Sequence, residues 1–330
     1  MKQSFQLIIA TVVLIGCKWE PNKSSSAPIS QVIRDIAACN VLMGNAVGIA
    51  AQRPQQWDRY ETLRSKATEQ ELLALANDTN CVVRCYAFQA LAERKKTDLF
   101  PVVLQHLSDT ATVHTLYGCL GGSQKVGDFF LETITKTGNN EKSWQLNRTQ
   151  RSAIDSVLLF KPGNKLEAKD NLLYNIQPQE KYYAQIRKIA MEENNKMAVV
   201  ALSKYRKQQD KPLIEQLLKD PNNQTCAFLS VREFPAPSFF PYLQQALKNE
   251  ITKNNDGNDV RLQLLYQAIV QYKDQPSRSL LQFALDEAKG MQYIYHWDYL
   301  QQALIQYPST IYDGLLKPIT PGIRTRKGGI

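Results

Sequence analysis

The amino-acid sequence predicts an all-α protein assembled from consecutive pairs of helices. Glycine and proline number 15 each among 330 residues, which is too few for a protein with many tight β-hairpins. A helix–break–helix pattern recurs along most of the chain, and runs with the alternation of a β-strand are nearly absent. The hydrophobic content of 43% is sufficient for a sizeable core, so the chain is not expected to be disordered.

The first residues have the organisation of a secretion signal. Lys2 precedes an apolar segment over residues 7–15 that ends at Gly16 and Cys17, and this segment is too short to span a bilayer. The four residues LIGC that end at Cys17 resemble the bacterial lipobox, whose cysteine becomes the lipid-modified first residue of the mature protein. An ordinary signal peptide that happens to end in cysteine is the alternative. We therefore predict a signal peptide over residues 1–16 and lipidation of Cys17.

The stretch after the signal indicates where the mature protein is held. Residues 17–29 are polar, contain two prolines and three serines, and lack helical or strand periodicity, which predicts a flexible tether. In lipoproteins an aspartate after the cysteine is associated with retention in the inner membrane. Lys18 stands in that place, so the resemblance implies an anchor in the outer membrane. The scarcity of acidic residues favours a periplasm-facing protein, with the cell surface as the alternative.

Five later segments follow one plan. Each contains a helix that ends in a small-then-aliphatic pair, a short polar break, and a second segment rich in large apolar residues. The last four aliphatic anchors are 27, 40 and 35 residues apart, a spacing typical of paired-helix repeats. Residues 30–318 are therefore predicted to form an α-solenoid, with an irregular stretch near residues 138–147, and residues 319–330 a disordered basic tail. The anchors are Leu91, Leu202, Leu229, Ile269 and Leu304.

Two of these units resemble the second helix of a HEAT repeat. Residues 78–91, DTNCVVRCYAFQAL, carry an acidic turn followed by Val-Arg and alanines, and residues 256–269, DGNDVRLQLLYQAI, repeat the pattern. The resemblance implies that the arginine ties repeats together, with Asp78 or Asp109 as partner for Arg84. Arg261 takes the same structural role in the second unit, because an arginine inside a helix stack is stabilised only with a carboxylate partner.

The resemblance extends further along the chain without adding an activity. Residues 99–127, together with the signal, are similar to a class of bacterial HEAT-like lipoproteins. The glycine-rich part of this stretch, residues 118–127, is interpreted as a repeat junction where two helices pack closely. A phosphate-binding loop is the alternative, but no strand is expected before it and no G-K-S/T follows it.

Five cysteines besides Cys17 raise the question of metal or disulfide chemistry. Cys81 and Cys85 share one helical face with about 6 Å between their Cβ atoms, which is too far for a disulfide. They are weak candidates for metal ligands because the short C-x-x-C spacing is missing. A disulfide between Cys85 and Cys119 and small buried thiols are the alternatives. No metal or cofactor is therefore expected. The residues that would complete a metal site are Cys39, Cys119, His106 and His114.

The segment MQYIYHWDYLQQAL, residues 291–304, contains aromatic rings that point in several directions on a helix. As the second helix of its pair, it is expected to line the concave side of the array. Tyr295, His296 and Tyr299 are therefore candidate residues for binding a peptide or ligand. The alternative is that these rings only thicken the core or cap of the last repeat.

The formal charge of +9 is spread along the chain, so nucleic acid is not expected as a partner. None of the three histidines lies in a recognisable catalytic motif. An array of helix pairs offers a long groove and no enclosed reaction chamber. The predicted function is therefore a membrane-anchored scaffold that binds a protein or peptide partner in the cell envelope. The alternatives are a glycan-acting or other enzyme on an α-α array, and a thiol- or metal-binding sensor.

Overall fold

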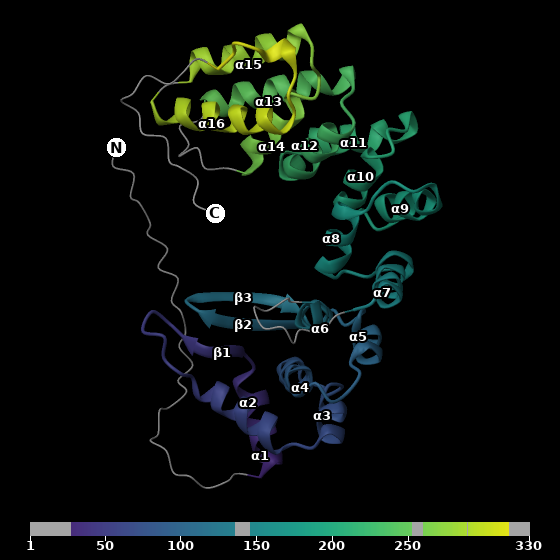
Figure 1. The fold of residues 1–330 in the computed structure, drawn as a ribbon, viewed down its shortest axis with the longest axis vertical. Coiled ribbons are helices and arrows are strands. Elements are labelled where there is room, and N and C mark those ends of the chain that lie inside the picture. The colour runs from purple at the N-terminus through teal and green to yellow at the C-terminus, as the bar shows by residue number, and fades with distance from the viewer. Residues whose placement is uncertain (1–27, 136–145, 253–259, 289, 317–330) are drawn as a thin grey trace, which may run out of the picture. The chain divides into compact units, whose positions relative to one another are not determined.

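The computed structural model describes residues 28–135, 146–252, 260–288 and 290–316. These residues are mostly helical and form sixteen α-helices, four short 3-10 helices and a three-stranded sheet (Figure 1). The chain divides into two compact units between Ile154 and Asp155, inside helix α7, Arg148–Phe160. We refer to them as unit 1 and unit 2. The predicted signal peptide, Cys17, most of the tether, most of the irregular stretch and the basic tail lie outside the described residues.

Unit 1 is built around helix α4, Cys81–Arg94, which packs against four other helices. Its N-terminus is capped by the side chain of Asn80, which accepts hydrogen bonds from the N–H groups of Val82 and Val83. Ten of its residues are buried, so α4 is apolar around most of its circumference, as a central helix must be. The other helices are α1 Ile29–Cys39, α2 Gln55–Lys66, α3 Glu69–Leu75, α5 Phe100–His106 and α6 Val126–Thr135.

A small sheet departs from the all-α prediction. Strand β1, Leu42–Val47, runs parallel to β2, Thr112–Gly118, and β2 pairs antiparallel with β3, Leu120–Lys125. The prediction that residues 118–127 join two closely packed helices is therefore wrong for residues 118–125, which belong to the β-hairpin. The sequence TVHTLY is rich in β-branched and aromatic residues, which favour a strand. Gly118, with φ of 56°, takes the left-handed conformation that the hairpin turn requires.

Helix α4 holds the first strand in place through one side chain. The hydroxyl of Tyr86 donates to the carbonyl of Met43 at 2.9 Å and accepts from its N–H at 2.8 Å. Tyr86 is fully buried, so this pair of bonds satisfies backbone groups that the strand ladder leaves free. The sheet is thereby attached to the central helix of unit 1.

Unit 2 is made of helix hairpins. The even-numbered helices α8, α10, α12, α14 and α16 each pack against the next, and α9, α11, α13 and α15 each pack against the even helix that follows (Figure 1). We call the even-numbered set the even-helix row. The bounds are α8 Glu167–Asn175, α9 Glu180–Glu192, α10 Lys196–Ser203, α11 Lys211–Lys219, α12 Gln224–Glu233, α13 Phe240–Thr252, α14 Val260–Ile269, α15 Gln275–Glu287 and α16 Met291–Gln306.

Backbone geometry repeats at the predicted anchors. Lys95, Arg206 and Lys273 follow the anchors Leu91, Leu202 and Ile269 by four residues, and all three have φ between 52° and 55°. Lys95 is the C-cap of α4, whereas Arg206 and Lys273 lie three and four residues beyond the ends of α10 and α14, where a left-handed residue redirects the chain. The same turn chemistry thus recurs in both units.

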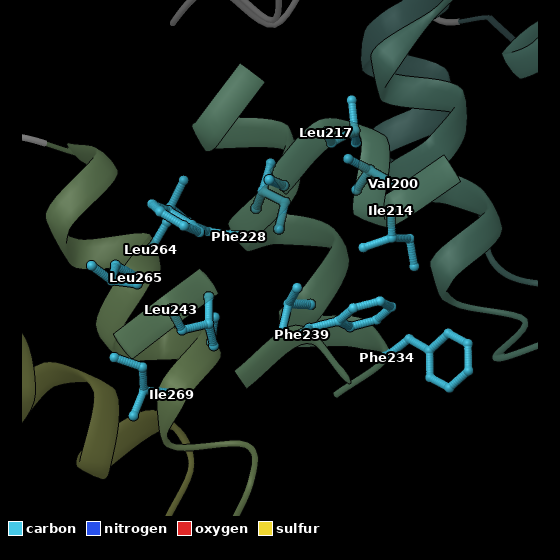
Figure 2. Packing of buried hydrophobic residues seen from close by; sticks show 14 of the residues in the cluster. Val200, Ile214, Leu217, Phe228, Phe234, Phe239, Leu243, Leu264, Leu265 and Ile269 are labelled. Carbon is cyan, nitrogen blue, oxygen red and sulfur yellow. The ribbon is translucent and has the colours of Figure 1, made fainter. Parts of the chain in front are cut away.

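The core of unit 2 is continuous through its hairpins. Figure 2 shows Phe228, Phe239, Leu243, Leu265 and Ile269 from successive elements converging on one apolar interior. Each hairpin therefore buries its apolar face against its neighbours, and burial at about 25 cal/mol per Å² is the main force that holds the hairpins together.

Candidate functional site

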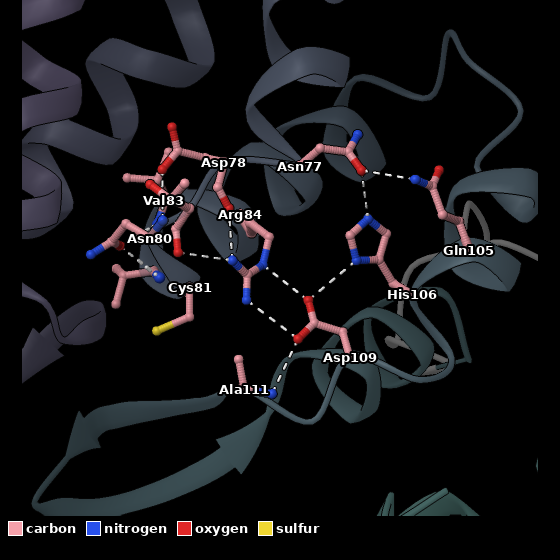
Figure 3. A network of polar contacts seen from close by, with 12 residues as sticks. Asn77, Asp78, Asn80, Cys81, Val83, Arg84, Gln105, His106, Asp109 and Ala111 are labelled. Carbon is pink, nitrogen blue, oxygen red and sulfur yellow. Dashed lines mark hydrogen bonds and ion pairs between the residues drawn. The ribbon is translucent and has the colours of Figure 1, made fainter. Parts of the chain in front are cut away.

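The strongest polar network in unit 1 surrounds Asp109 (Figure 3). The Nε of Arg84 lies 3.0 Å from Oδ2 of Asp109 as an ion pair without hydrogen-bond alignment, and its Nη2 donates to Oδ1 at 3.3 Å. Its Nη1 donates to the carbonyls of Asp78 and Thr79 at 2.7 and 3.1 Å. Asp109 is thus the carboxylate partner, while Asp78 contributes only its backbone carbonyl.

His106 extends this network on the other side of Asp109. Its Nδ1 lies 3.3 Å from Oδ2 of Asp109, and its Nε2 lies 3.2 Å from Oδ1 of Asn77. Burial raises the pKa of Asp109, but hydrogen bonds from His106 and from the N–H of Ala111, with the charge of Arg84, outweigh it and hold that pKa below its ordinary value. His106, Arg84 and the N–H of Ala111 all stabilise the ionised form of this carboxylate.

The network resembles the Asp–His part of a catalytic triad but lacks the rest of one. In Figure 3 the imidazole is flanked by Asp109 and Asn77, so neither ring nitrogen faces a hydroxyl or thiol. A general base needs a proton donor within reach. We therefore assign the network to the structure of unit 1.

The cysteines are not assembled into a reactive centre. The Sγ of Cys81 donates to the carbonyl of Thr112 at 3.4 Å, and Cys85 is buried in α4. Burial raises the pKa of the Cys85 thiol well above its ordinary value, so it is held as a neutral thiol. Cys119 lies exposed in the hairpin turn, and none of the five described cysteines forms a disulfide. Within the described ranges, no group of three or more potential metal ligands occurs.

The aromatic helix α16 corrects one sequence prediction. His296 is only 2% exposed, and its Nδ1 lies 2.7 Å from the hydroxyl of the buried Tyr266. The expected outward orientation of His296 is therefore wrong. Burial lowers its pKa to about 4, against the opposing effect of Glu250. The sequence contained a signal for this burial: His296 precedes the buried Leu300 and Ala303 by four and seven residues, which places all three on one face of the helix.

Tyr295 and Tyr299 keep the partial exposure that a binding role requires. Both lie on α16, the last helix of the even-helix row. Arg261 lies on the neighbouring α14, where it contacts Gln224 at 2.9 Å and Glu250 at 3.2 Å. These contacts connect α14 with α12 and α13, as a structural residue would.

Polar side chains bridge neighbouring helices of the even-helix row. Nδ2 of Asn195, which caps α10, donates to Asp170 of α8 at 2.6 Å. Arg232 of α12 donates to Gln267 of α14 at 3.0 Å, and Gln263 of α14 donates to Gln302 of α16 at 2.8 Å. Asp170 and Gln302 are exposed and Asn195 and Gln263 half-buried, whereas Gln267 is buried.

A cavity of about 620 Å³ adjoins the first helices of the row. Asp170, Glu193, Lys196, Met197 and Cys226 are among its lining residues, so it combines both charges with an apolar wall. Burial and the nearby Asp170 raise the pKa of Cys226, which is therefore a neutral lining group. Sequence reasoning missed this cavity because its residues come from four helices, α8, α9, α10 and α12, and from the loops beside them.

Comparison of the chain with protein-family models, with curated proteins and with solved structures finds no match. Within the residues that the structure describes, none of the helices combines the length and apolar character needed to span a bilayer.

Proposed function

We propose that this protein is a membrane-anchored lipoprotein of the cell envelope that binds a protein or peptide partner. The helix hairpins are proposed to form a HEAT-like α-solenoid whose even-helix row is the binding surface. The observation that carries this proposal is the series of polar side chains that bridge neighbouring helices from α8 to α16. It is joined by the half-exposed rings of Tyr295 and Tyr299 and by a cavity of about 620 Å³ at the α8–α12 part.

The chemistry of the even-helix row fits a polypeptide partner. Gln263 and Gln302 each offer both a donor and an acceptor, which is what the main chain of an extended segment needs. Tyr295 and Tyr299 supply stiff amphipathic rings with little loss of side-chain entropy on binding. Together they combine main-chain recognition with aromatic anchors.

The charges of the row also favour a polypeptide over a polyanion. The cavity contains Asp170 and Glu193 beside Lys196, and Arg232 is already paired with Glu233 at 3.0 Å. Nucleic acid would need several unpaired cations along one track. A mixed surface suits a partner that carries both charges.

The membrane anchor is proposed from the N-terminal residues. The apolar segment over residues 7–15 and the box that ends at Cys17 support cleavage before Cys17 and acylation of its thiol. Mass spectrometry of the mature N-terminus is expected to show an acylated Cys17. Cys17→Ser is expected to move most of the protein out of the membrane fraction. An uncleaved signal peptide on the wild-type protein would contradict the anchor.

Site-specific photocrosslinking in cells tests the binding surface. A photoreactive residue at Tyr299 of α16 is expected to capture a discrete partner. Phe283 of α15 is the matched control, because it is an aromatic residue with 39% of its surface exposed on an odd-numbered helix. Equal capture at both positions, or none at Tyr299, would overturn the proposal.

Alanine variants provide the second arm of this test. The pair Tyr295→Ala and Tyr299→Ala is expected to weaken capture by the intact chain at least about tenfold, as loss of aromatic anchors does. Phe283→Ala is expected to leave it unchanged. Circular dichroism checks that each variant keeps its helical content.

A further inference from the structure

Two loop tips lie side by side at one end of the sheet in unit 1. The loop Gly48–Ala51 follows β1, and the turn around Cys119 joins β2 to β3. The N–H of Gly48 donates to the carbonyl of Gly118 at 2.8 Å, and Val47 pairs with Gly118. The two tips therefore form one surface projection.

This projection is apolar and highly exposed. Ile49 is 98% exposed and Leu120 is 79% exposed, and Tyr117 beside them is 44% exposed. No charged residue occurs over residues 42–52 or 115–124. Surface turns ordinarily carry Asn, Asp or Ser, which bind water or their own backbone.

Internal packing does not account for the two aliphatic residues. The turns need left-handed conformations at Gly48, Ala51 and Gly118, with φ of 73°, 49° and 56°, and neither aliphatic residue is among them. Ile49 and Leu120 bury almost none of their surface within the chain. Adjacent exposed aliphatic side chains of this kind mark a surface that is covered by something else.

We propose that this projection inserts into the interfacial region of the lipid bilayer, with Ile49 and Leu120 as the inserted side chains. The proposal rests on the lipid anchor at Cys17. Pro28, the N-cap of α1, follows Cys17 by eleven residues. A chain of this length can span at most about 36–40 Å. A unit of this size is about 35 Å across, so the anchor holds every face of unit 1 within reach of the membrane.

The shape and composition of the tips select the bilayer as the occupant. A stable protein interface needs about 800 Å² on each partner, which two narrow turns do not offer. A convex tip with aliphatic side chains and a tyrosine at its base matches the interface of a bilayer, where amphipathic rings lie at the level of the headgroups. Insertion is shallow, because backbone groups of the turns must keep their hydrogen bonds to water.

Cys119 provides a reporter at the centre of the projection. The acylated full-length protein, carrying Cys39→Ser, Cys81→Ser and Cys226→Ser, is labelled at Cys119 with an environment-sensitive fluorophore. It is then reconstituted in phosphatidylethanolamine–phosphatidylglycerol vesicles. We expect a blue shift of emission and quenching by lipids that carry a spin label near the headgroup.

Variants at the tips then separate insertion from simple proximity. Ile49→Ser with Leu120→Ser is expected to abolish the blue shift and to lower vesicle binding of the non-acylated Cys17→Ser chain by about tenfold or more. Both side chains are exposed, so neither change is expected to disturb folding. The matched control is Ile305→Ser on α16, which removes an aliphatic side chain that is 75% exposed in unit 2.

The outcomes distinguish this inference from the proposed function. Mass spectrometry of Cys17 reports on the anchor independently of the fluorophore. If Cys17 is not acylated, the same labelled chain is held on nickel-chelating vesicles through an N-terminal histidine tag. Absence of quenching in either format overturns the inference, as does a spectral change that needs a second copy or a protein partner instead of vesicles.

Discussion

Asp109 of unit 1 and Asp210 of unit 2 perform similar tasks in different surroundings. Both carboxylates accept from an arginine: Arg84 with 11% of its side chain exposed, and Arg187 with 37% exposed. Asp210 also accepts from the hydroxyl of Tyr183 at 2.8 Å. The buried group is therefore the arginine in unit 1 and the carboxylate in unit 2.

This difference shows that the cost of breaking an ion pair depends on which charge remains buried. An arginine with access to water regains its hydration when its partner is removed, whereas a buried one does not. In unit 1, Arg84, His106 and the N–H of Ala111 converge on the single carboxylate of Asp109. In unit 2, the contacts Asn195–Asp170, Arg232–Gln267 and Gln263–Gln302 each connect a different pair of neighbouring helices.

The largest expected effect comes from removing the two carboxylates. Asp109→Ala leaves Arg84 buried without its partner and is expected to lower the free energy of unfolding by about 3–5 kcal/mol. Asp210→Ala leaves Arg187 half in water and is expected to cost only about 1–2 kcal/mol. Urea denaturation measures the free energy of unfolding of both variants. Equal losses would contradict the distinction between a buried arginine and a buried carboxylate.

Acid is expected to weaken unit 2 before unit 1. The pKa of His296 falls from its ordinary 6.5 to about 4 on folding, so between these pH values the unfolded chain binds a proton that the folded chain does not. Stability of unit 2 should therefore fall as the pH drops from about 6.5 toward 4, by up to about 3 kcal/mol. The contribution of Asp109, whose pKa is lowered from 3.8, persists above pH 3.8 and is lost only as the pH falls below it.

Hydrogen exchange resolved by peptide measures this difference. Between pH 6.5 and 4.5, protection corrected for intrinsic exchange is expected to decline in α14 and α16 while α4 keeps its protection. His296→Gln should remove most of the decline, and the exposed His114→Gln should not. A decline of equal size in α4 would contradict the assignment to His296.

Removal of single tyrosine hydroxyls is expected to have a smaller effect. Tyr86→Phe leaves both backbone groups of Met43 without their partner beneath the sheet and is expected to cost about 1–3 kcal/mol. Tyr205→Phe removes an equivalent pair of bonds to Gln179, at 2.9 and 3.1 Å, at an exposed site. Water replaces that hydroxyl, so the expected loss is below about 1 kcal/mol. Thermal unfolding of both variants tests whether Tyr86→Phe loses more stability than Tyr205→Phe.

The smallest expected effect is that of Gly121→Ala, compared with Gly118→Ala in the same sheet of unit 1. Gly118→Ala is expected to cost about 1–2 kcal/mol, since its φ of 56° strains any side chain. Gly121 lies in β3, where an added Cβ meets nothing within 4 Å. Gly121→Ala is therefore expected to be neutral or to stabilise by about 0.5 kcal/mol. Calorimetry measures the stability change of each variant. A loss for Gly118→Ala without a loss for Gly121→Ala would support this account, and a loss of similar size for both would contradict it.

Much of the helical pattern could be predicted from local sequence. The anchors Leu91, Leu202 and Ile269 precede left-handed turns because short polar breaks and helix-ending residues are properties of neighbouring residues. The sheet was missed although TVHTLYG carries strand signals, because a repeat resemblance over residues 99–127 favoured helix. Pairing of β1 with β2 joins residues about seventy positions apart, which no local pattern reveals.

The sequence by itself determined that this chain is mostly helical and that Arg84 needs a carboxylate, because propensity, capping and the cost of a buried charge are local or general. Only the tertiary structure decided that Asp109 is that carboxylate, that His296 is buried against Tyr266, and that Ile49 and Leu120 share one exposed projection. Each of these depends on which distant segments meet. That meeting is set by the packing of whole helices and strands, whose energy is spread over many residues.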